Sequence, residues 1–543
     1  MGYNIYPIED CMPQGTQVIH GVEYVYEYDS KRNAEKNYNT HKRHYIGKMV
    51  DGVFVPNKNY QLQKALEQAT SIPPGPVPSV LHTRSFFGAT YLFDAIGEKL
   101  GITADLCGCF PDLWKQILSI AYFLILEDKN SISRFPRWAA HHMHPYGNSI
   151  PSQRSSELFA CIDEDARRRF FLKHANRRVE TEYLAYDITS ISSYSRLLSQ
   201  VRYGRNKDHD PLPQINLAML YGDVSRLPVY YRTLPGNIAD VTTIRTLLTD
   251  IDLLKLDKVK LVLDRGFYSE ENINALYHHH YKFLIAVPKH IRFVQDILDD
   301  VRMSMRTRAC YSSRYRINTY SRTIEWSYHH RKPRSGALDE GSRRLYLHLF
   351  FNDQRAVDDK AAFNILLDTL EAELYSGKLD PEHEKLYKKY FEYAETPVRG
   401  MQVTPIQSSI DEAEKNYGYF ALISNDIKDP LEALRIYRSK DLIEKAFGNL
   451  KERLNLRRTS VSSEENLEGK LFVQFIALMY LSYIDKMMDE QNLYKDYTLH
   501  ELLDELDVIE CFGHPSRRLQ IGEITKKQAE LFKKLDVPVP LGV

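Results

Sequence analysis

The chain has 543 residues and a mass of 63.4 kDa, with 43% hydrophobic residues, 27% charged residues and a net charge of zero. This length exceeds the roughly 250–300 residues at which a single hydrophobic core stops growing, so several modules are expected. The composition excludes a disordered chain, and six cysteines are too few for a disulfide framework. A balanced charge argues against a protein that coats nucleic acid indiscriminately.

Apolar runs in the sequence are too short to cross a membrane. The longest two, Ile117 to Leu126 and Leu471 to Ile484, fall short of the 18 or more residues that a bilayer span needs, so no membrane partner is expected. The first residues, MGYNIYPIED, carry neither a basic region nor an apolar region of an export signal. We therefore expect a cytoplasmic protein.

The first part of the chain predicts two modules. Residues 1–70 hold Tyr-rich extended stretches with a hairpin turn at Asp51-Gly52, which predicts a small β-rich module. Four prolines in Ser71 to Ser79 predict a linker, because proline denies helix and sheet hydrogen bonds. Residues 80–180 repeat apolar side chains at helical spacing, which predicts a helical module that could bind DNA ends.

Two polar clusters in the helical module do not by themselves indicate a functional site. The histidines of AAHHMHP, at 141, 142 and 144, lack the spacing and partner ligands of a zinc site. The basic residues between Arg167 and Arg178 fit DNA phosphates and a solvated helix face equally well.

Strand-like and helical runs alternate from residue 181 onward. Residues 181–288 and 416–498 predict the two halves of one α/β catalytic domain, and residues 289–415 predict a β-rich domain inserted between them. A long helix is expected from about Pro430 to Leu454, and residues 499–543 form a helical tail.

The predicted insertion carries a strongly basic segment. Between Arg302 and Arg334 there are nine basic residues and one acid, with aromatic residues interleaved. Cations next to flat rings suit phosphates and unstacked bases, whereas a solvated strand pair is the simpler alternative. The predicted DNA contacts are Arg314, Arg316 and Arg322, with Trp326 stacking on a displaced base.

Two carboxylates lie at strand positions that call for an explanation. Asp187 lies within the apolar run EYLAYDITSISS, and Asp264 directly follows the run KVKLVL. Open α/β sheets bind ligands beyond the carboxyl ends of their strands, which favours a functional role for Asp264. Either aspartate taken singly could instead be a turn or cap residue.

A third motif lies in IYRSKDLIEKAFGNLKERLNLRR. At about 100° per residue, Tyr437, Lys440, Glu444 and Lys451 fall within about 60° of one another on a helix, so they form one polar stripe. Burying such a stripe without partners would be costly, so it either faces solvent or lines a charged site.

The spacing Tyr437-x2-Lys440-x3-Glu444-x6-Lys451 resembles the Y-x2-R-x3-E-x6-K signature of insertion-sequence DDE transposases, with lysine in place of the usual arginine. Lysine supplies a point charge where arginine supplies a planar fork, so the charge is kept and the geometry differs. Asp187 in YDITS and Asp264 in LDRGF stand at the two earlier motif positions. The resemblance extends from about Arg43 to Val537 and includes the block from Gly204 to Asn237.

This resemblance implies a ribonuclease-H-like mixed sheet with helices, interrupted by an inserted domain. It also implies Asp187, Asp264 and Glu444 as catalytic metal ligands, with Tyr437, Lys440 and Lys451 against DNA. Three carboxylates suit two hard cations, Mg²⁺ or Mn²⁺, in phosphoryl transfer.

The expected function is a transposase that binds terminal inverted repeats as a homodimer, cleaves the ends and joins the 3′-hydroxyl to target DNA. The alternatives are a structure-selective nuclease of the same fold and a catalytically inactive DNA-binding descendant.

Overall fold

The computed structural model describes residues 14–33, 38–50, 52–70, 83–127, 131–178, 182–256, 258–331, 338–396, 400–514 and 517–540. The predicted linker from Ser71 to Ser79 lies outside these residues. The chain divides into two compact units. The first comprises residues 1–84, 511–522 and 541–543, and the second comprises residues 85–510 and 523–540.

The first unit contains a four-stranded antiparallel sheet in the order β1-β2-β3-β4. Val50 lies opposite Val53, so β3 and β4 form a tight hairpin, and Gly52 adopts a positive φ of 77° that favours glycine. Asp51, the other predicted turn residue, lies outside the described residues. The elements are β1 (Gln14–Ile19), β2 (Val22–Asn33), β3 (Tyr38–Val50), β4 (Val53–Pro56), α1 (Lys58–Thr70), β18 (Glu510–His514) and β19 (Arg517–Ile521).

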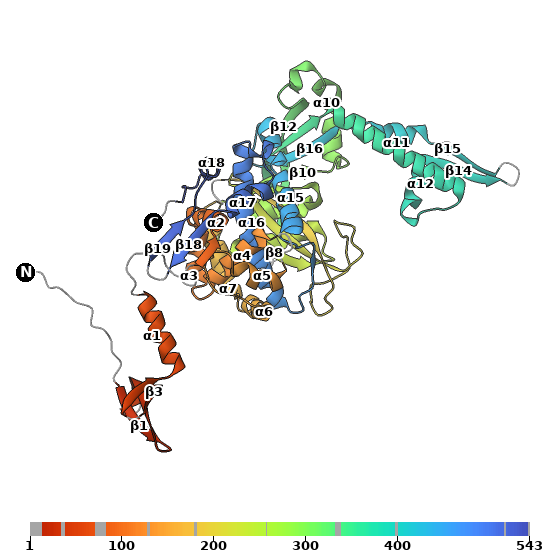
Figure 1. Cartoon of the computed structure of the whole chain (residues 1–543). Helices are drawn as coiled ribbons and strands as arrows, with labels where there is room; N and C mark the ends of the chain where they lie inside the picture. Colours follow the sequence, from red (N-terminus) through yellow and green to blue (C-terminus); the bar gives the residue numbers. More distant parts are fainter. Residues whose placement is uncertain are drawn as a thin grey trace, which may run out of the picture. The chain divides into compact units, whose positions relative to one another are not determined.

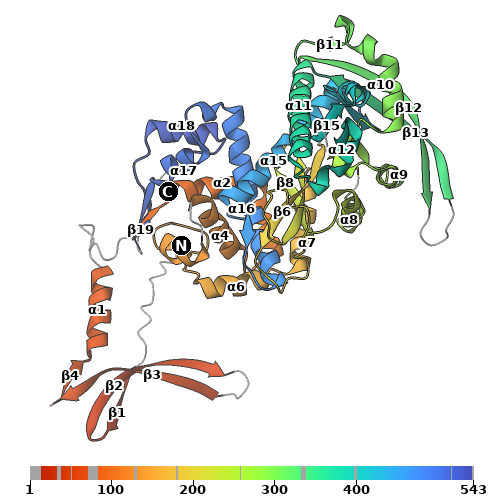
Figure 2. The same ribbon diagram turned by 90° about the vertical axis from the view of Figure 1, so that its right-hand side faces the viewer.

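Helices open the second unit and pack around one central helix, α16 (Glu464–Glu490), which contacts α4 and α6 (Figure 2). By length and composition α16 could span a membrane, but 89% of its apolar window is buried inside the protein, as in a core helix. The other helices here are α2 (Gly88–Leu100), α3 (Ile102–Cys109), α4 (Trp114–Leu126), α5 (Phe135–Ala139), α6 (Ser152–Ala160), α7 (Glu164–Asn176), α17 (Leu499–Asp507) and α18 (Lys526–Lys534). Strand β5 (Thr83–Phe86) includes the boundary between the two units, at residues 84 and 85.

A large mixed sheet forms the rest of the second unit, in the order β11-β12-β13-β16-β10-β9-β6-β7-β8 with β17 also on β6. Strand β6 runs antiparallel to β7 and parallel to β9, which is parallel to β10. The strands are β6 (Leu184–Ser193), β7 (Gln214–Gly222), β8 (Pro228–Pro235), β9 (Lys260–Leu263), β10 (Lys282–Val287), β11 (Tyr311–Ser312), β12 (Ile317–Arg331), β13 (Leu338–Phe351), β16 (Tyr419–Ser424) and β17 (Arg458–Thr459). Their connecting helices include α8 (Asp240–Leu253), α9 (Glu270–His278) and α10 (Arg292–Met305).

The segment predicted as an inserted β-rich domain is divided between the large sheet and a projecting arm. Strands β11, β12 and β13 extend the large sheet, because residues 345–351 of β13 are buried and pair with β16 on one edge and β12 on the other. The remainder runs outward along α11 to a two-stranded sheet (Figure 1). It has its own apolar core around Phe363 and Tyr387. The arm comprises α11 (Asp353–Ser376), α12 (Glu384–Tyr390), β14 (Phe391–Thr396), β15 (Gly400–Pro405) and α13 (Gln407–Glu414).

The helix expected from Pro430 to Leu454 is broken into pieces. It consists of α14 (Pro430–Arg438), α15 (Asp441–Gly448) and a π-helical turn (Asn449–Arg453), with Ser439 and Lys440 between the first two. Helix α15 packs against β6 and β7, which brings its polar side chains to the middle of the sheet.

Candidate active site

Asp187 and Asp264 lie on neighbouring strands at the centre of the large sheet. In the parallel pair of β6 and β9, Tyr186 lies opposite Leu263, and each aspartate is the next residue along its chain. Asp187 lies within β6 and its side chain is 14% exposed, whereas Asp264 directly follows β9 and its side chain is 36% exposed. Burial raises the pKa of Asp187, and the nearby negative charge of Asp264 adds to this effect.

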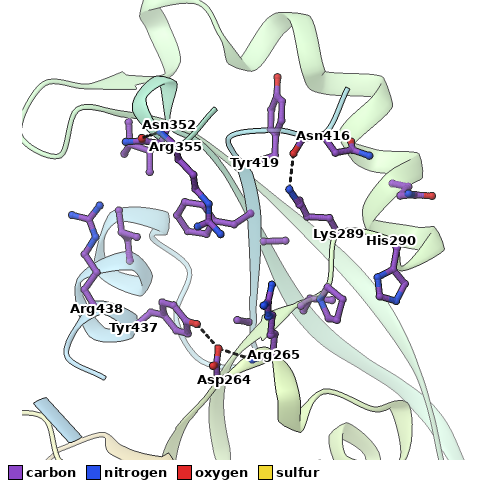
Figure 3. Close-up of a pocket in the computed structure, with 18 of the residues that line it drawn as sticks. Asp264, Arg265, Lys289, His290, Asn352, Arg355, Asn416, Tyr419, Tyr437 and Arg438 are labelled. Carbon is purple, nitrogen blue, oxygen red and sulfur yellow. Dashed lines mark hydrogen bonds between the residues drawn. The ribbon is translucent and has the colours of Figure 1, made fainter. Parts of the chain in front are cut away.

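Asp264 is held by three donors. The Tyr437 hydroxyl and the backbone N–H of Arg265 each donate to Oδ1 at 2.8 Å, and the Lys440 ammonium donates to Oδ2 at 3.3 Å (Figure 3 shows the first two). Burial by itself would raise the pKa of Asp264, but the charge of Lys440 and these hydrogen bonds hold it below its ordinary value. Asp264 is therefore an ionised carboxylate with a fixed orientation.

Lys440 links the carboxylates of two separate elements. Its Nζ lies 2.9 Å from Oε1 of Glu444 on α15 and 3.3 Å from Oδ2 of Asp264, and its side chain is 11% exposed. Burial disfavours its charge, but Asp264, Glu444 and the nearby Asp187 outweigh burial and raise the pKa of Lys440. The alternative in which this stripe faces solvent does not describe Lys440, because its ammonium is enclosed by carboxylates.

Asp187 has a cationic neighbour that the sequence pattern did not indicate. Lys207 Nζ lies 3.5 Å from Asp187 Oδ1 and 3.6 Å from Asp240 Oδ2, and it donates to the carbonyl of Ile188. Burial keeps the pKa of Asp187 raised although Lys207 and Lys440 lower it. Lys207 belongs to the block from Gly204 to Asn237 that carries the resemblance, and that block was the only signal for it in the sequence.

The loop that contains Lys207 also provides the ion-pair partner of Lys451. The Nζ of Lys451 lies 2.6 Å from Oδ2 of Asp208, and the Lys451 side chain is only 9% exposed. Lys451 thus ties the π-helical turn to the loop before β7. Among the described residues its ion pair is with Asp208 and not with the three predicted catalytic carboxylates.

The residues of the basic segment that are predicted to bind DNA differ in their exposure. Arg314 is exposed and lies over the Tyr315 ring at 5.3 Å, Arg316 is exposed beside it, and Arg322 is exposed near Asp300 at 3.8 Å. Lys332 and Arg334 lie outside the described residues.

The prediction that Trp326 stacks on a displaced base is wrong for this structure. Its indole is buried, its Nε1 donates to Asn274 Oδ1 at 2.8 Å, and its ring packs edge-on against Phe293. Alternation along β12 directs this ring inward, between the strand and the helices α9 and α10.

The His cluster of the helical module is structural. His142 pairs with Asp507 at 3.0 Å, and His144 accepts or donates a hydrogen bond with Ser119 at 2.9 Å. Burial lowers the pKa of His144 to about 4, so it is neutral near pH 7.

A cavity of about 970 Å³ opens beside Asp264 (Figure 3). It lies between the ends of β9 and β10, the start of β16, the first turn of α11 and the last turn of α14. Cations dominate its charged lining, and Asp264 is the one carboxylate among the lining residues. The cations are Arg265, Lys289, Arg355, Arg438 and Lys440.

The central strands of the α/β sheet thus bring two aspartates together, and the cavity beside Asp264 is lined mainly by cations. Residues 181–480 match the family model described as "Transposase DDE domain". This match covers more than half of the chain, which therefore belongs to that family of transposases.

Similarity to individual proteins is more distant. No curated protein matches the chain. Among solved structures, the chain is similar to the piggyBac transposase in the cryo-EM structure of its synaptic complex with hairpin DNA. The sequence identity is 10%, the match covers 76% of this chain and 70% of the other, and the TM-score is 0.31.

The predicted catalytic carboxylates have the chemistry of a divalent-metal site, and DDE transposases generally depend on such metals. Carboxylate oxygens suit hard cations, and Lys440 already places a positive charge between Asp264 and Glu444. Their oxygens are not all within 4.8 Å of one another. Among the described residues, only Glu373, Asp380 and His383, on the arm, form a group of three that close.

Proposed function

We propose that the chain is a DNA transposase that binds the ends of a mobile element, cleaves them by metal-dependent phosphodiester hydrolysis and joins the freed 3′-hydroxyl to target DNA. Membership of the transposase family supports the class of activity. The proposed reactive group is formed by Asp187, Asp264 and Glu444; the Lys440 ammonium contacts Asp264 and Glu444, and the charge of Asp187 acts on the same ammonium.

The observation that carries this proposal is the convergence on Lys440. Three carboxylates from β6, from the end of β9 and from α15 act on one buried ammonium, although they are separated by 77 and 180 residues in sequence (187 to 264, and 264 to 444). Such a cluster contributes little to stability, because the carboxylates repel one another and Lys440 and Lys207 offset only part of their charge. A substrate that brings cations and a phosphate would balance the charges.

The order of the central strands supports a ribonuclease-H-like core. Strands β8, β7 and β6 form an antiparallel meander, and β9 and β10 continue from β6 in parallel. In this arrangement the first and fourth strands are neighbours, which brings Asp187 next to Asp264.

Each residue of the site has a separate task in the proposed reaction. Asp187, Asp264 and Glu444 would hold one or two divalent ions, Mg²⁺ or Mn²⁺, which activate the attacking oxygen and stabilise the leaving oxygen. Tyr437 orients Asp264 through its hydrogen bond, and Lys207 offsets the charge of the buried Asp187. The Lys440 ammonium, which lies against Asp264 and Glu444, would contact a phosphate bound beside Asp264.

DNA is the proposed partner, in the form of terminal inverted repeats and target DNA. Support comes from the exposed arginines of the basic segment: Arg314 and Arg316 lie in the turn between β11 and β12, and Arg322 lies on β12. Two ends have to be processed together, so we propose that the DNA-bound form is a homodimer.

The test of this function uses three variants of the protein. The DNA that flanks the gene supplies the end sequences for the cleavage and binding assays. Asp187→Asn, Asp264→Asn and Glu444→Gln each remove a ligand charge and keep the side-chain size. We expect loss of end cleavage in Mg²⁺ with end binding retained in a gel-shift assay. If one variant cleaves at the wild-type rate, the residue that it replaces is not a catalytic metal ligand.

Two other functions predict different results in the same assay. A structure-selective nuclease would cleave branched DNA and yield no strand-transfer product when target plasmid is added. An inactive descendant would bind the ends and cleave nothing in Mg²⁺ or Mn²⁺. All three predicted carboxylates are present, which favours the active transposase.

A further inference from the structure

The cavity beside Asp264 contains arginines that have no acidic partner. Arg265, Arg355 and Arg438 line it, and within the described parts of the chain none of the three has an ion pair with a carboxylate. Arginines elsewhere in the molecule do pair with acids, such as Arg232 with Asp250. Three unpaired guanidinium groups around one cavity are a surplus of positive charge that an anion would offset.

The cations of this cavity are close enough to act on one another. The pKa of Lys289 is lowered, first by burial, and the charges of Arg355 and Arg265 add to this effect although Asp359 opposes it. Arg265 and Arg355 also lower the pKa of Tyr437, which burial and Asp264 raise overall. Figure 3 shows Arg265 rising from below and Arg355 reaching down from above into the same space.

Aromatic rings hold two of these guanidinium groups in place. The Arg355 guanidinium lies 5.1 Å from the centre of the Phe420 ring, which stacks on Phe350 at 4.7 Å. Arg438 lies 5.6 Å from the Tyr315 ring. Such cation–π contacts fix a guanidinium while leaving its N–H groups free to donate to a ligand.

Tyr315 also connects the cavity to the basic segment. Arg314 lies 5.3 Å from the same Tyr315 ring, so Arg314 and Arg438 share one aromatic partner. Positive charge therefore continues from Lys440 at the carboxylates, through the cavity, to the exposed surface at Arg314.

From these observations we infer that the cavity binds the phosphate backbone of an unpaired DNA strand that continues away from the scissile phosphate at Asp264. The volume of about 970 Å³ lies at the upper end of the range of about 300–1,000 Å³ for ligand pockets, which suits a few units of a single strand and not a duplex. Arginine forks match phosphate oxygens, and the partly exposed rings of Phe420 and Tyr437 in the lining offer apolar surface to sugars and bases.

This inference rests on the proposed function, because the transposase reaction supplies the strand. The test measures binding of a fluorescent mixed-sequence single-stranded oligonucleotide to the full chain, in EDTA, across a range of KCl concentrations. The variant is Arg355→Gln with Arg438→Gln. Removing one arginine–phosphate pair from a single-strand complex lowers the log–log salt slope by about 0.7, so removing two lowers it by about 1.4.

Two controls separate the cavity from general charge and from misfolding. Arg245→Gln removes an exposed arginine that pairs with Glu271 on α9 at 2.6 Å, outside the cavity, and it should leave the slope unchanged. Arg355→Lys with Arg438→Lys keeps both charges and should restore most of the slope. Melting temperatures report folding of each variant.

An unchanged slope in the double glutamine variant, or an equal loss in Arg245→Gln, would overturn the inference. This outcome is distinct from failure of the proposed function. If the wild-type chain cleaves its ends while the slope does not move, only the cavity assignment fails. If the slope falls as expected while no end is cleaved, the strand site stands and the catalytic function fails.

Discussion

Lys440 offers the sharpest test of the site, because its ammonium lies between two predicted catalytic carboxylates. Replacing it by alanine removes donors at 3.3 Å from Asp264 and 2.9 Å from Glu444 in an environment where the side chain is 11% exposed. In the proposed reaction the same ammonium contacts the phosphate, and a charged hydrogen bond to a phosphate contributes about 1.5–3 kcal/mol. A surface i,i+4 pair with Glu444 alone would contribute only about 0.2–0.5 kcal/mol.

The expected result is a reduction in the single-turnover rate of end processing by about ten- to a hundredfold in Lys440→Ala, since about 1.36 kcal/mol corresponds to tenfold. Lys440→Arg should remain active because it keeps the charge. The matched control is Lys445→Ala, which removes an exposed lysine from the same helix α15 and should process ends at the wild-type rate. The assay follows cleavage of an uncut and a pre-cut end in Mg²⁺.

Equal rates for Lys440→Ala and the wild type would refute the reasoning. That result would mean that the ammonium stabilises only the metal-free arrangement of the carboxylates and plays no part in the reaction. A fall of melting temperature in EDTA with an unchanged cleavage rate would identify this case.

Two further predictions concern buried residues of the sheet. Trp326→Phe should lower the melting temperature, because Asn274 loses its buried hydrogen-bond partner at a cost of about 1–3 kcal/mol. The salt dependence of DNA binding should stay unchanged in this variant. A flatter salt slope would mean that Trp326 does bind DNA. His348 is fully buried between Ser321 and the carbonyl of Ile427, and burial lowers its pKa to about 4. Because the folded-state pKa lies below the unfolded value of about 6.5, the stabilisation is complete above about pH 6.5 and is lost between about pH 6.5 and 4, by on the order of 3 kcal/mol. Melting curves of His348→Gln over this interval should therefore fall less steeply with decreasing pH than those of the wild type, and parallel curves would contradict the assignment.

Much of the fold follows from local patterns in the sequence. The apolar runs EYLAYDITSISS and KVKLVL correspond to β6 and β9, and the alternation of strand-like and helical runs from residue 181 onward predicted an α/β sheet, because burial on a sheet requires apolar residues. The two aspartates stood out because each follows or interrupts an apolar run. The spacing of Tyr437, Lys440, Glu444 and Lys451 indicated one shared face. Tyr437 and Lys440 contact Asp264, and Glu444 contacts Lys440, although the helix is broken at Ser439. Lys451 instead pairs with Asp208.

Only the tertiary structure decided which segments meet. A buried strand such as β13 shows in its sequence that it is covered, but not that its partner is β16, so the continuation of the large sheet could not be predicted. The same holds for Trp326, whose inward direction depends on the register of β12 with β13.

The basic cavity is the clearest case of this difference. Arg265, Arg355 and Arg438 come from the end of β9, the first turn of α11 and the end of α14, and no local pattern distinguishes them from the many exposed arginines of the chain. Sequence alone determined which side chains carry charge and which local elements they belong to. Their convergence beside Asp264 arises because strand pairing and helix packing bring distant segments together, and those long-range contacts are set by the fold as a whole.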